Sequence, residues 1–558
     1  MATKKVIVLG GGVAGLTAAH ELIERGFNVE VYERQEQCGG KARSITKDKS
    51  GTSGRKDLPG EHGFRFFPGF YQHIPDTMRR IPYSTNTNGV FDNLVRASES
   101  AIAQETKPLY TFLTHQPSSL DDWFLVFKDW FGRSELNLQP GESTFFIYRM
   151  LDIMSMCTER RFARLEFKKW WDYIGAARRS LQYQKLLARG LTRCLVAMRA
   201  EEACTRTVGS ILIQMLMSLT SQSGTMDRVL NGPTSDVWIT PWVKYLESKG
   251  VQFRNNARLD SFDFNGTSVA GVTLMQGGTK TKVQGDYYVA AFPVEVACSL
   301  FTEEMRKAAP SISNLSNLKT EWMNGIQFYL ARDIKCCQGH VIYADSPWAI
   351  TSVSQPQFWS NTDLSQFGNG KVQGLVSVDI SDWTTPGVKT TTKAAQHCAS
   401  PDEIANEVWA QIVAHLAATS DPASDGDRDD WFLDPSIVFP VVTNTQPLLV
   451  NIVGSWANRP KAATEIPNLF LASDYVQTYT DLATMEGANE AARRATNAIL
   501  SASGSSATPC GVWEFPEPVV FQPLKDLDRV FFKLGLPHIG FGWLKQLRRL
   551  LKRAHLWQ

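Results

Sequence analysis

The sequence has no pair of cysteines in the C-x-x-C spacing. Its nine cysteines, an odd number, are scattered from Cys38 to Cys510, and only Cys336 and Cys337 are close together. Adjacent cysteines do not form the spaced pair that binds zinc or exchanges disulfides, so we expect reduced cysteines, as in cytoplasmic proteins. The nine histidines are dispersed, and neither a Ser-His-Asp triad nor a metal-ligand set is recognisable. We therefore predict no metal site.

The sequence also lacks an apolar run suited to a bilayer. Residues 207–226 carry no charge, but Gln214, Ser218 and Thr220 make them too polar to span one comfortably. We interpret residues 211–219 as a helix buried in protein. Residues 6–19 resemble a signal peptide, but they contain four glycines and are followed at once by charged residues. These features favour a cytoplasmic protein.

Charge and length narrow the class further. The net charge is only +2 over 558 residues, so the molecule as a whole is not a nucleic-acid binder. A chain of this length is too long for one hydrophobic core and is expected to form two or more domains.

The first thirty residues predict a strand, a helix and a second strand. Residues 5–9 are apolar enough for a buried parallel strand, and residues 15–25 carry a helical apolar face. Residues 29–32 are the second strand, and Glu33 follows it directly. Between the first strand and the helix lies a G-x-G-x-x-G sequence, in which Gly10 permits the turn, Gly12 admits a pyrophosphate and Gly15 allows close helix packing. Val13 and Ala14 lie in the same turn, just before the helix whose amino end favours phosphate.

An acidic residue after the second strand is typical of a dinucleotide site. Glu33 can accept hydrogen bonds from an adenosine ribose, which favours FAD or NAD over NADP. The alternative is a glycine-rich turn without a ligand.

The segment after Glu33 indicates which dinucleotide is bound. It contains Arg34, then Cys38, Gly39, Gly40, Lys41, Ala42 and Arg43. This acid, short loop and Gly-Gly-basic turn resembles the flavin amine oxidase and phytoene desaturase superfamily. The resemblance implies FAD, with Arg34, Gly40, Lys41 and Arg43 at the cofactor. It also implies an α/β fold: a Rossmann-like FAD-binding domain, with a parallel sheet and a β-meander, and an inserted α+β substrate domain. Cys38, near a phosphate site, could have a lowered pKa, but an unreactive turn cysteine is the stronger interpretation.

Three further segments match the family. The resemblance places Gly63, Phe64 and Arg65 along the flavin ring, although Arg65 stands where related desaturases have histidine. Arg65 could stabilise an anionic reduced ring and is our candidate catalytic residue; the alternative is that it pairs with a carboxylate.

Near the C-terminus, Asp474 would accept hydrogen bonds from the ribityl hydroxyls, and Thr484 and Met485 would begin a helix facing the ring. Leu259 would contact the adenine. The segments at residues 232–238 and 322–325 look closest to the carotene desaturase and hydroxysqualene dehydroxylase branch.

We expect the FAD-binding domain to be assembled from three separated pieces, residues 1–84, 226–300 and 451–503. Residues 85–225, mainly helical, and 301–450 would form the substrate domain, with an acidic loop at 421–430. Residues 504–558 would be a linker followed by a C-terminal helix. In that helix, residues 543–557, leucines share one face and Lys545, Arg548, Arg549, Lys552 and Arg553 occupy much of the rest. This pattern predicts peripheral binding to an anionic membrane surface, or else a helix docked on its own domain.

Three functions remain open at this point. The first is an FAD-dependent desaturase or dehydrogenase that moves hydride between an apolar isoprenoid or carotenoid-type small molecule and flavin N5. The second is an FAD-dependent amine or amino-acid oxidase that releases an imine and hydrogen peroxide. The third is a flavin-binding protein without turnover.

Overall fold

A parallel sheet near the amino terminus organises the molecule. The computed structural model describes residues 3–111, 123, 128, 136–220, 227–360 and 362–540. Within them, five parallel strands lie in the order β10 (Gln252–Arg254), β2 (Asn28–Tyr32), β1 (Lys5–Leu9), β14 (Tyr287–Ala290) and β24 (Leu469–Leu471). Strands that are adjacent in this sheet come from three distant parts of the chain, so the amino-terminal, central and carboxyl-terminal pieces share one hydrophobic core.

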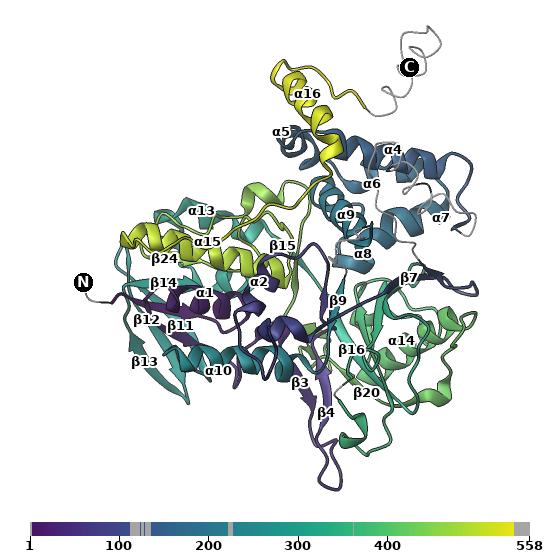
Figure 1. Cartoon of the computed structure of the whole chain (residues 1–558), viewed down its shortest axis with the longest axis horizontal. Helices are drawn as coiled ribbons and strands as arrows, with labels where there is room; N and C mark the ends of the chain where they lie inside the picture. The colour runs from purple at the N-terminus through teal and green to yellow at the C-terminus, as the bar shows by residue number, and fades with distance from the viewer. Residues whose placement is uncertain are drawn as a thin grey trace.

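Two long helices pack beside this sheet. Helix α1 (Val13–Ile23) follows β1 after the glycine turn, and α15 (Met485–Ser503) follows β24; the two lie side by side (Figure 1). Their contact depends on small residues, because Ala18, Ala19, Ala491, Ala492 and Ala495 are all almost fully buried. Such residues let helices approach closely without losing apolar burial.

Two small sheets adjoin the parallel sheet. Strands β11 (Ala257–Phe264), β12 (Val269–Gln276) and β13 (Thr279–Val283) form an antiparallel meander. Strand β9 (Arg228–Leu230) pairs with both β5 (Phe66–Phe67) and β6 (Leu94–Arg96), which ties the amino-terminal piece to the central piece.

A second large sheet has seven strands among the described residues. Their order is β20 (Arg428–Leu433), β16 (Asn324–Leu330), β19 (Gly374–Ile380), β18 (Ile350–Ser354), β17 (Gly339–Tyr343), β7 (Glu99–Ala103) and β8 (Tyr110–Thr111). Helix α14 (Pro401–Leu416) covers one face, where Trp409 packs against Phe328 (Figure 1). Because side chains alternate along a strand, the residues on either side of those that pack under α14 face away from that helix.

Helices form a third body. They include α4 (Glu142–Ser155) and α9 (Thr205–Thr220), and α16 (Gln522–Lys533) packs against α4 and projects at the top of Figure 1. The predicted buried helix at residues 211–219 is confirmed as part of α9, with Ile211, Leu212, Ile213 and Leu216 buried. Over the residues that were placed, no helix combines the length and apolarity that crossing a bilayer requires.

The predicted α/β class is confirmed, and most predicted strands and helices are present within one or two residues. The prediction of an acidic loop at 421–430 is wrong for its last three residues. Residues 428–430 begin β20, because they continue the hydrogen-bond ladder with β16 through Leu330 and Tyr329. The segment 543–557 lies outside the described residues.

Candidate cofactor and substrate site

One cavity of about 630 Å³ joins the two large sheets. On one side it meets the carboxyl ends of β1, β2, β14 and β24, where Gly10, Glu33, Ala291 and Ser473 line it. The carboxyl edge of a parallel sheet is where such folds bind nucleotides, because the loops there open a crevice. On the other side the cavity reaches the face of the seven-stranded sheet that lies opposite α14, through His340, Thr351 and Asp379.

The glycine turn has the shape that a bound pyrophosphate needs. Gly10 has φ +110°, and a Cβ there would lie 2.5 Å from the carbonyl oxygen of Ala291; a Cβ on Gly15 would lie 1.8 Å from the carbonyl oxygen of Gly10. Gly12 differs, because its added Cβ would meet only the Cα of Gly40, at 3.7 Å. The protein's own packing therefore explains Gly10 and Gly15, whereas beside Gly12 it forms a cradle that a side chain would fill. Val13 and Ala14 line the same space.

Glu33 is held at the end of β2 with its carboxylate at the cavity. One oxygen accepts from the backbone N–H of Gly11 at 2.7 Å, and the other accepts from the N–H of Gln35 at 2.8 Å. Each carboxylate oxygen can accept a second hydrogen bond. The side chain is thus fixed by the loop while keeping acceptor capacity for two neighbouring hydroxyls, as a ribose presents.

The basic turn after Glu33 surrounds the same end of the cavity. Gly39 and Gly40 both have positive φ, which brings Gly40 against Gly12, and Arg34, Lys41 and Arg43 line the cavity. Lys41 donates to the carbonyl of Pro447, and Arg43 donates to the carbonyl of Gly40 at 2.8 Å. A lowered pKa for Cys38 is wrong: burial raises the pKa of that thiol to about 12, with the charge of Glu33 adding to the effect.

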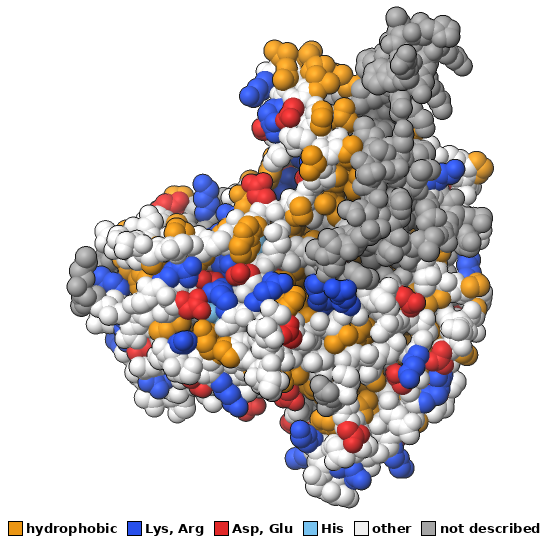
Figure 2. Space-filling model, in the orientation of Figure 1, with side chains coloured by type: hydrophobic (Ala, Val, Ile, Leu, Met, Phe, Trp, Pro, Cys, Tyr) orange, Lys and Arg blue, Asp and Glu red, His pale blue; other side chains and the backbone are white. Residues whose placement is uncertain are grey.

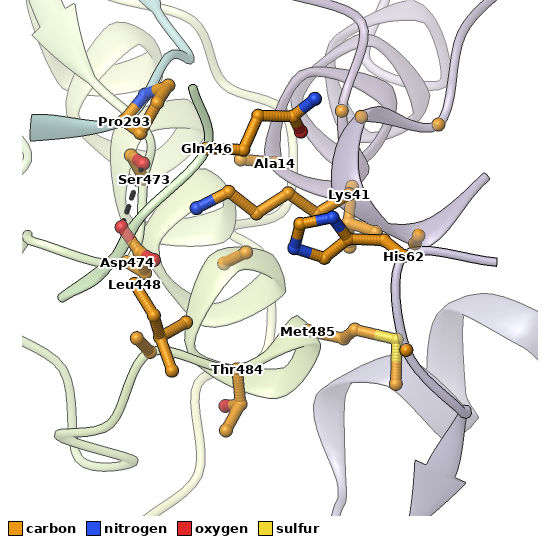
Figure 3. Close-up of a pocket in the computed structure, with 18 of the residues that line it drawn as sticks. Ala14, Lys41, His62, Pro293, Gln446, Leu448, Ser473, Asp474, Thr484 and Met485 are labelled. Atoms are coloured by element: carbon orange, nitrogen blue, oxygen red, sulfur yellow. Dashed lines mark hydrogen bonds between the residues drawn. The ribbon is translucent and has the colours of Figure 1, made fainter. Parts of the chain in front are cut away.

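The carboxyl-terminal segment supplies the opposite wall, shown in Figure 3. Lys41 reaches toward the side that carries Ser473 and Asp474, whose side chains are hydrogen bonded to each other at 3.2 Å. Thr484 caps α15 by accepting from the N–H of Gly487, so the amino end of this helix, with Met485, faces the cavity. The first N–H groups of a helix have no intrahelical acceptor and favour negative charge nearby. Leu259 on β11 lines the adjoining part.

Arg65 does not behave as a simple carboxylate partner. Its guanidinium donates to the carbonyl of Lys41 and, at 3.3 Å, to that of Ala42, while Glu61 lies 3.9 Å away. Gly63, Phe64 and Arg65 all line the cavity. Arg65 therefore joins the Gly-Gly-basic turn to the segment at Gly63 and Phe64, which we expect to lie beside the flavin.

A histidine–carboxylate pair beside Gly63 and Phe64 is not recognisable in the sequence. His62 projects into the cavity next to Lys41 (Figure 3), and its Nδ1 lies 2.5 Å from a carboxylate oxygen of Asp434. Asn324 donates to the same oxygen at 2.6 Å. Burial lowers the pKa of His62, and the pKa of Asp434 is lowered despite its burial by the nearby imidazole. Because Asp434 follows β20, only the folded chain brings it to His62.

Other cavity residues were also missed. Asp379, Thr351 and His340 lie on β19, β18 and β17, and Glu295 lies in the first turn of α11 (Val294–Leu300). Burial raises the pKa of Asp379 to about 7, and one carboxylate oxygen of Glu295 is buried without a protein partner. Strand alternation was the only sequence signal, since Asp379 lies between the apolar residues Val378 and Ile380.

The fold and the cavity define a dinucleotide-binding protein whose cradle, acid and facing helix end fit FAD. The chain belongs to the flavin containing amine oxidoreductase family, which matches residues 13–500. It is an FAD-dependent oxidoreductase. It is 24% identical over 533 residues to a zeta-carotene desaturase from Synechocystis, covering 89% of this chain and 97% of that protein. It is 24% identical over 522 residues to a 15-cis-phytoene desaturase from Glycine max, covering 90% and 80%.

Solved structures show the same fold at lower identity. A putrescine oxidase bound to putrescine gives a TM-score of 0.60 at 10% identity, covering 89% of this chain and 99% of that one. Cyclohexylamine oxidase from Brevibacterium oxydans gives a TM-score of 0.57 at 12% identity, covering 90% and 100%.

Proposed function

We propose that FAD lies along the cavity from the parallel sheet to the seven-stranded sheet. The adenosine half would contact Glu33 and Leu259, with the pyrophosphate between the two glycine turns. The cradle beside Gly12 supports this arrangement, because the contacts within the protein do not require a glycine there. The residues proposed to contact FAD are Gly10, Gly12, Val13, Ala14, Gly15, Glu33, Arg34, Gly40, Lys41, Arg43, Gly63, Phe64, Arg65, Leu259, Asp474, Thr484 and Met485.

The domain division follows the same proposal. Residues 1–84, 226–300 and 451–503 would hold the cofactor, and residues 85–225 and 301–450 would hold the substrate. The pairing of β7 with β17, which brings residues 99–103 into the second sheet, supports this grouping.

The proposed reaction is a desaturation or dehydrogenation of an apolar isoprenoid or carotenoid-type molecule. Its main support is the similarity to carotene and phytoene desaturases along nearly the whole chain. When bound, FAD supplies an acceptor for a hydride. The chain's own residues orient the substrate, exclude water, and accept the proton from the adjacent carbon. His62 is suited to accept this proton. Burial lowers its pKa and so keeps the imidazole neutral before the reaction, and the carboxylate of Asp434 stabilises the imidazolium that would form.

Anaerobic mixing tests this function. FAD-loaded protein should lose its oxidised-flavin absorbance near 450 nm on addition of an isoprenoid polyene precursor such as phytoene or zeta-carotene, with a more conjugated product in the extract. Bleaching by amines and not by isoprenoids would exclude the desaturase proposal. FAD that no donor of either class reduces would favour a flavin-binding protein without turnover.

An amine oxidase is the second candidate, and one observation favours it. Asp379, which is buried, and Asp227, which is half-buried, are carboxyls that line the cavity, and a carboxylate can pair with a substrate ammonium. Burial raises the pKa of Asp227 to about 6, as it raises that of Asp379. Hydrogen peroxide production with simple primary amines, absent in an Asp379→Asn variant, would support this candidate over the first.

We also infer that the carboxyl-terminal segment binds an anionic membrane surface, from which an apolar substrate could enter. The basic segment 543–557, predicted from the sequence to be helical, provides the charges, at roughly 1 kcal/mol each near such a surface. The segment before it exposes several large apolar side chains, which gather over α16 in Figure 2: Val519, Leu527, Val530, Leu534 and Leu536. The protein would then be cytoplasmic and peripheral on the inner face of a membrane.

Liposome sedimentation tests this inference. A chain ending at Gly540 keeps His538, whose Nδ1 lies 2.8 Å from Asp528 in α16, so the truncation spares the described fold. The truncated protein should keep its FAD and sediment less with phosphatidylglycerol vesicles, most clearly at low salt. Equal sedimentation of the two chains would show that residues 541–558 are not the anchor.

A further inference from the structure

The face of the seven-stranded sheet opposite α14 carries polar side chains where it meets the cavity. Asp379 on β19 is the direct cross-strand partner of Thr351 on β18. On β17, Ile342 pairs with Thr351, so His340, two residues earlier, points to the same side. All three side chains line the cavity, and each residue is less than a tenth exposed.

Two of these groups have no partner within the protein. The Thr351 hydroxyl and the Nε2 of His340 are buried without any hydrogen bond. Phe64 and Phe66 contact the His340 ring, with centroids 5.3 and 5.1 Å away, but offer it no hydrogen bond. A buried polar group that lacks a partner costs free energy, so such groups in a binding cavity indicate a ligand that completes them.

The opposite face of the same strands shows that this polarity is local. Val376, Val378 and Ile380 of β19 and Ile350 of β18 lie in the apolar core under α14. A hydrocarbon alone would leave the Thr351 hydroxyl and the Nε2 of His340 unpaired, whereas a hydroxyl can donate one hydrogen bond and accept others. The carboxylate of Asp379 can accept, and the hydroxyl of Thr351 can donate.

We propose that Asp379, Thr351 and His340 form a subsite for a hydroxyl group, so that the substrate is an apolar molecule carrying an alcohol beside the reacting carbons. This proposal rests on the proposed function, which places an apolar substrate in this half of the cavity. The Asp379 carboxyl receives the alcohol hydrogen, and Thr351 and His340 face its oxygen. The subsite thus determines specificity and orientation, while the flavin segment at Gly63 and Phe64 borders it.

The test compares two probes that differ by one hydroxyl. FAD-loaded protein is titrated with farnesol and with the hydrocarbon farnesene, and binding is followed by the perturbation of the flavin absorption spectrum. The wild-type protein should bind farnesol at least about tenfold more tightly, because a site built to pair a hydroxyl disfavours the analogue that lacks it. Thr351→Val, which keeps the side-chain shape, and Asp379→Asn should each reduce that preference and leave farnesene binding unchanged.

Ser377→Ala is the matched control. Ser377 lies on the same face of β19, but its hydroxyl accepts a hydrogen bond from Gln355 at 3.3 Å and it does not line the cavity. This variant should keep the wild-type preference for farnesol. Retained FAD and farnesene binding show that each variant is folded. Equal affinity of the wild-type protein for both probes, or a preference that survives in both subsite variants, would overturn the subsite alone. Failure of both probes to bind would overturn the apolar-substrate function together with the subsite.

Discussion

The two ends of the cavity are built in different ways. At the parallel sheet, the groups proposed to face the nucleotide are mostly backbone, and they come from short continuous segments, residues 10–15 and 33–43. At the seven-stranded sheet, the facing groups are single side chains from separate strands, Asp379, Thr351 and His340. The first end needs particular glycines in order, whereas the second needs only a register between strands. The nucleotide end is therefore readable as a motif, and the substrate end is not.

The two ends meet at one close backbone contact. The N–H of Gly325 on β16 donates to the carbonyl of His62 at 2.6 Å, and a Cβ on Gly325 would lie 2.6 Å from the Cα of Gly63. A Cβ on Gly63 would itself lie 2.4 Å from a carboxylate oxygen of Asp379. These glycines let the segment proposed to border the flavin lie directly on the substrate sheet.

The largest expected effect breaks the nucleotide end alone. Gly12→Val should abolish FAD binding, because the side chain would fill the pyrophosphate cradle, while the chain still folds. The backbone of Gly12 (φ −72°, ψ −175°) is accessible to valine, and an added Cβ contacts only Gly40. Flavin content of the purified protein measures the first effect and circular dichroism the second. Gly426→Val, at another glycine with open surroundings, should keep its flavin. A folded Gly12→Val protein with full FAD would place the cofactor elsewhere.

Local patterns in the sequence predict features that depend on neighbours along the chain. The turn around Gly12, the acid Glu33 and Met485 at the start of α15 were predicted in this way, and the structure brings all three to one cavity. The sequence alone could not show the partner of His62, because Asp434 belongs to a distant strand end. It also left Arg65 between two roles, and the hydrogen bonds of Arg65 to the carbonyls of Lys41 and Ala42 follow from how two loops meet. Residues 340, 351 and 379 look like ordinary strand residues until the register is known.

The next effect concerns the substrate end and depends on pH. Burial raises the pKa of Asp379 to about 7 from its ordinary value of 3.8; Arg65 opposes this, and Asp434 and Glu61 add to it. The folded state therefore holds a proton that the unfolded state has lost between these values. Stability contributed by this proton is fully present below pH 3.8 and declines as the pH rises to about 7. Asp379→Asn removes this loss.

Urea unfolding of the wild-type protein and the Asp379→Asn variant should show it. Between pH 5 and 7 the variant should gain at most about 2.7 kcal/mol of stability relative to wild type, with no further gain from pH 7 to 8. Taking the difference cancels the groups common to both proteins. Asp363→Asn is the control, since hydrogen bonds from Ser365 and Gln366 lower the pKa of that exposed carboxyl. Its difference from wild type should be constant over this range. A constant difference for Asp379→Asn as well would show that Asp379 is ionised throughout, as an ammonium-binding carboxylate would be.

The smallest expected effect sharpens the contribution of side chains to the nucleotide end. Glu33→Gln keeps the size of the side chain but replaces one acceptor oxygen with an NH2 donor. The glutamine therefore cannot accept from the N–H groups of both Gly11 and Gln35, and it has only one oxygen left to accept from a ribose hydroxyl. Losing a hydrogen bond to a charged group costs about 1.5–3 kcal/mol, so FAD affinity should fall roughly 10- to 150-fold without abolishing binding. Reconstitution of flavin-free protein, followed by flavin fluorescence, measures this. Glu36→Gln, at an exposed carboxylate in the same loop, is the matched control and should bind FAD like wild type. An unchanged affinity in Glu33→Gln would mean that Glu33 only shapes the loop, and that backbone groups alone hold the adenosine half.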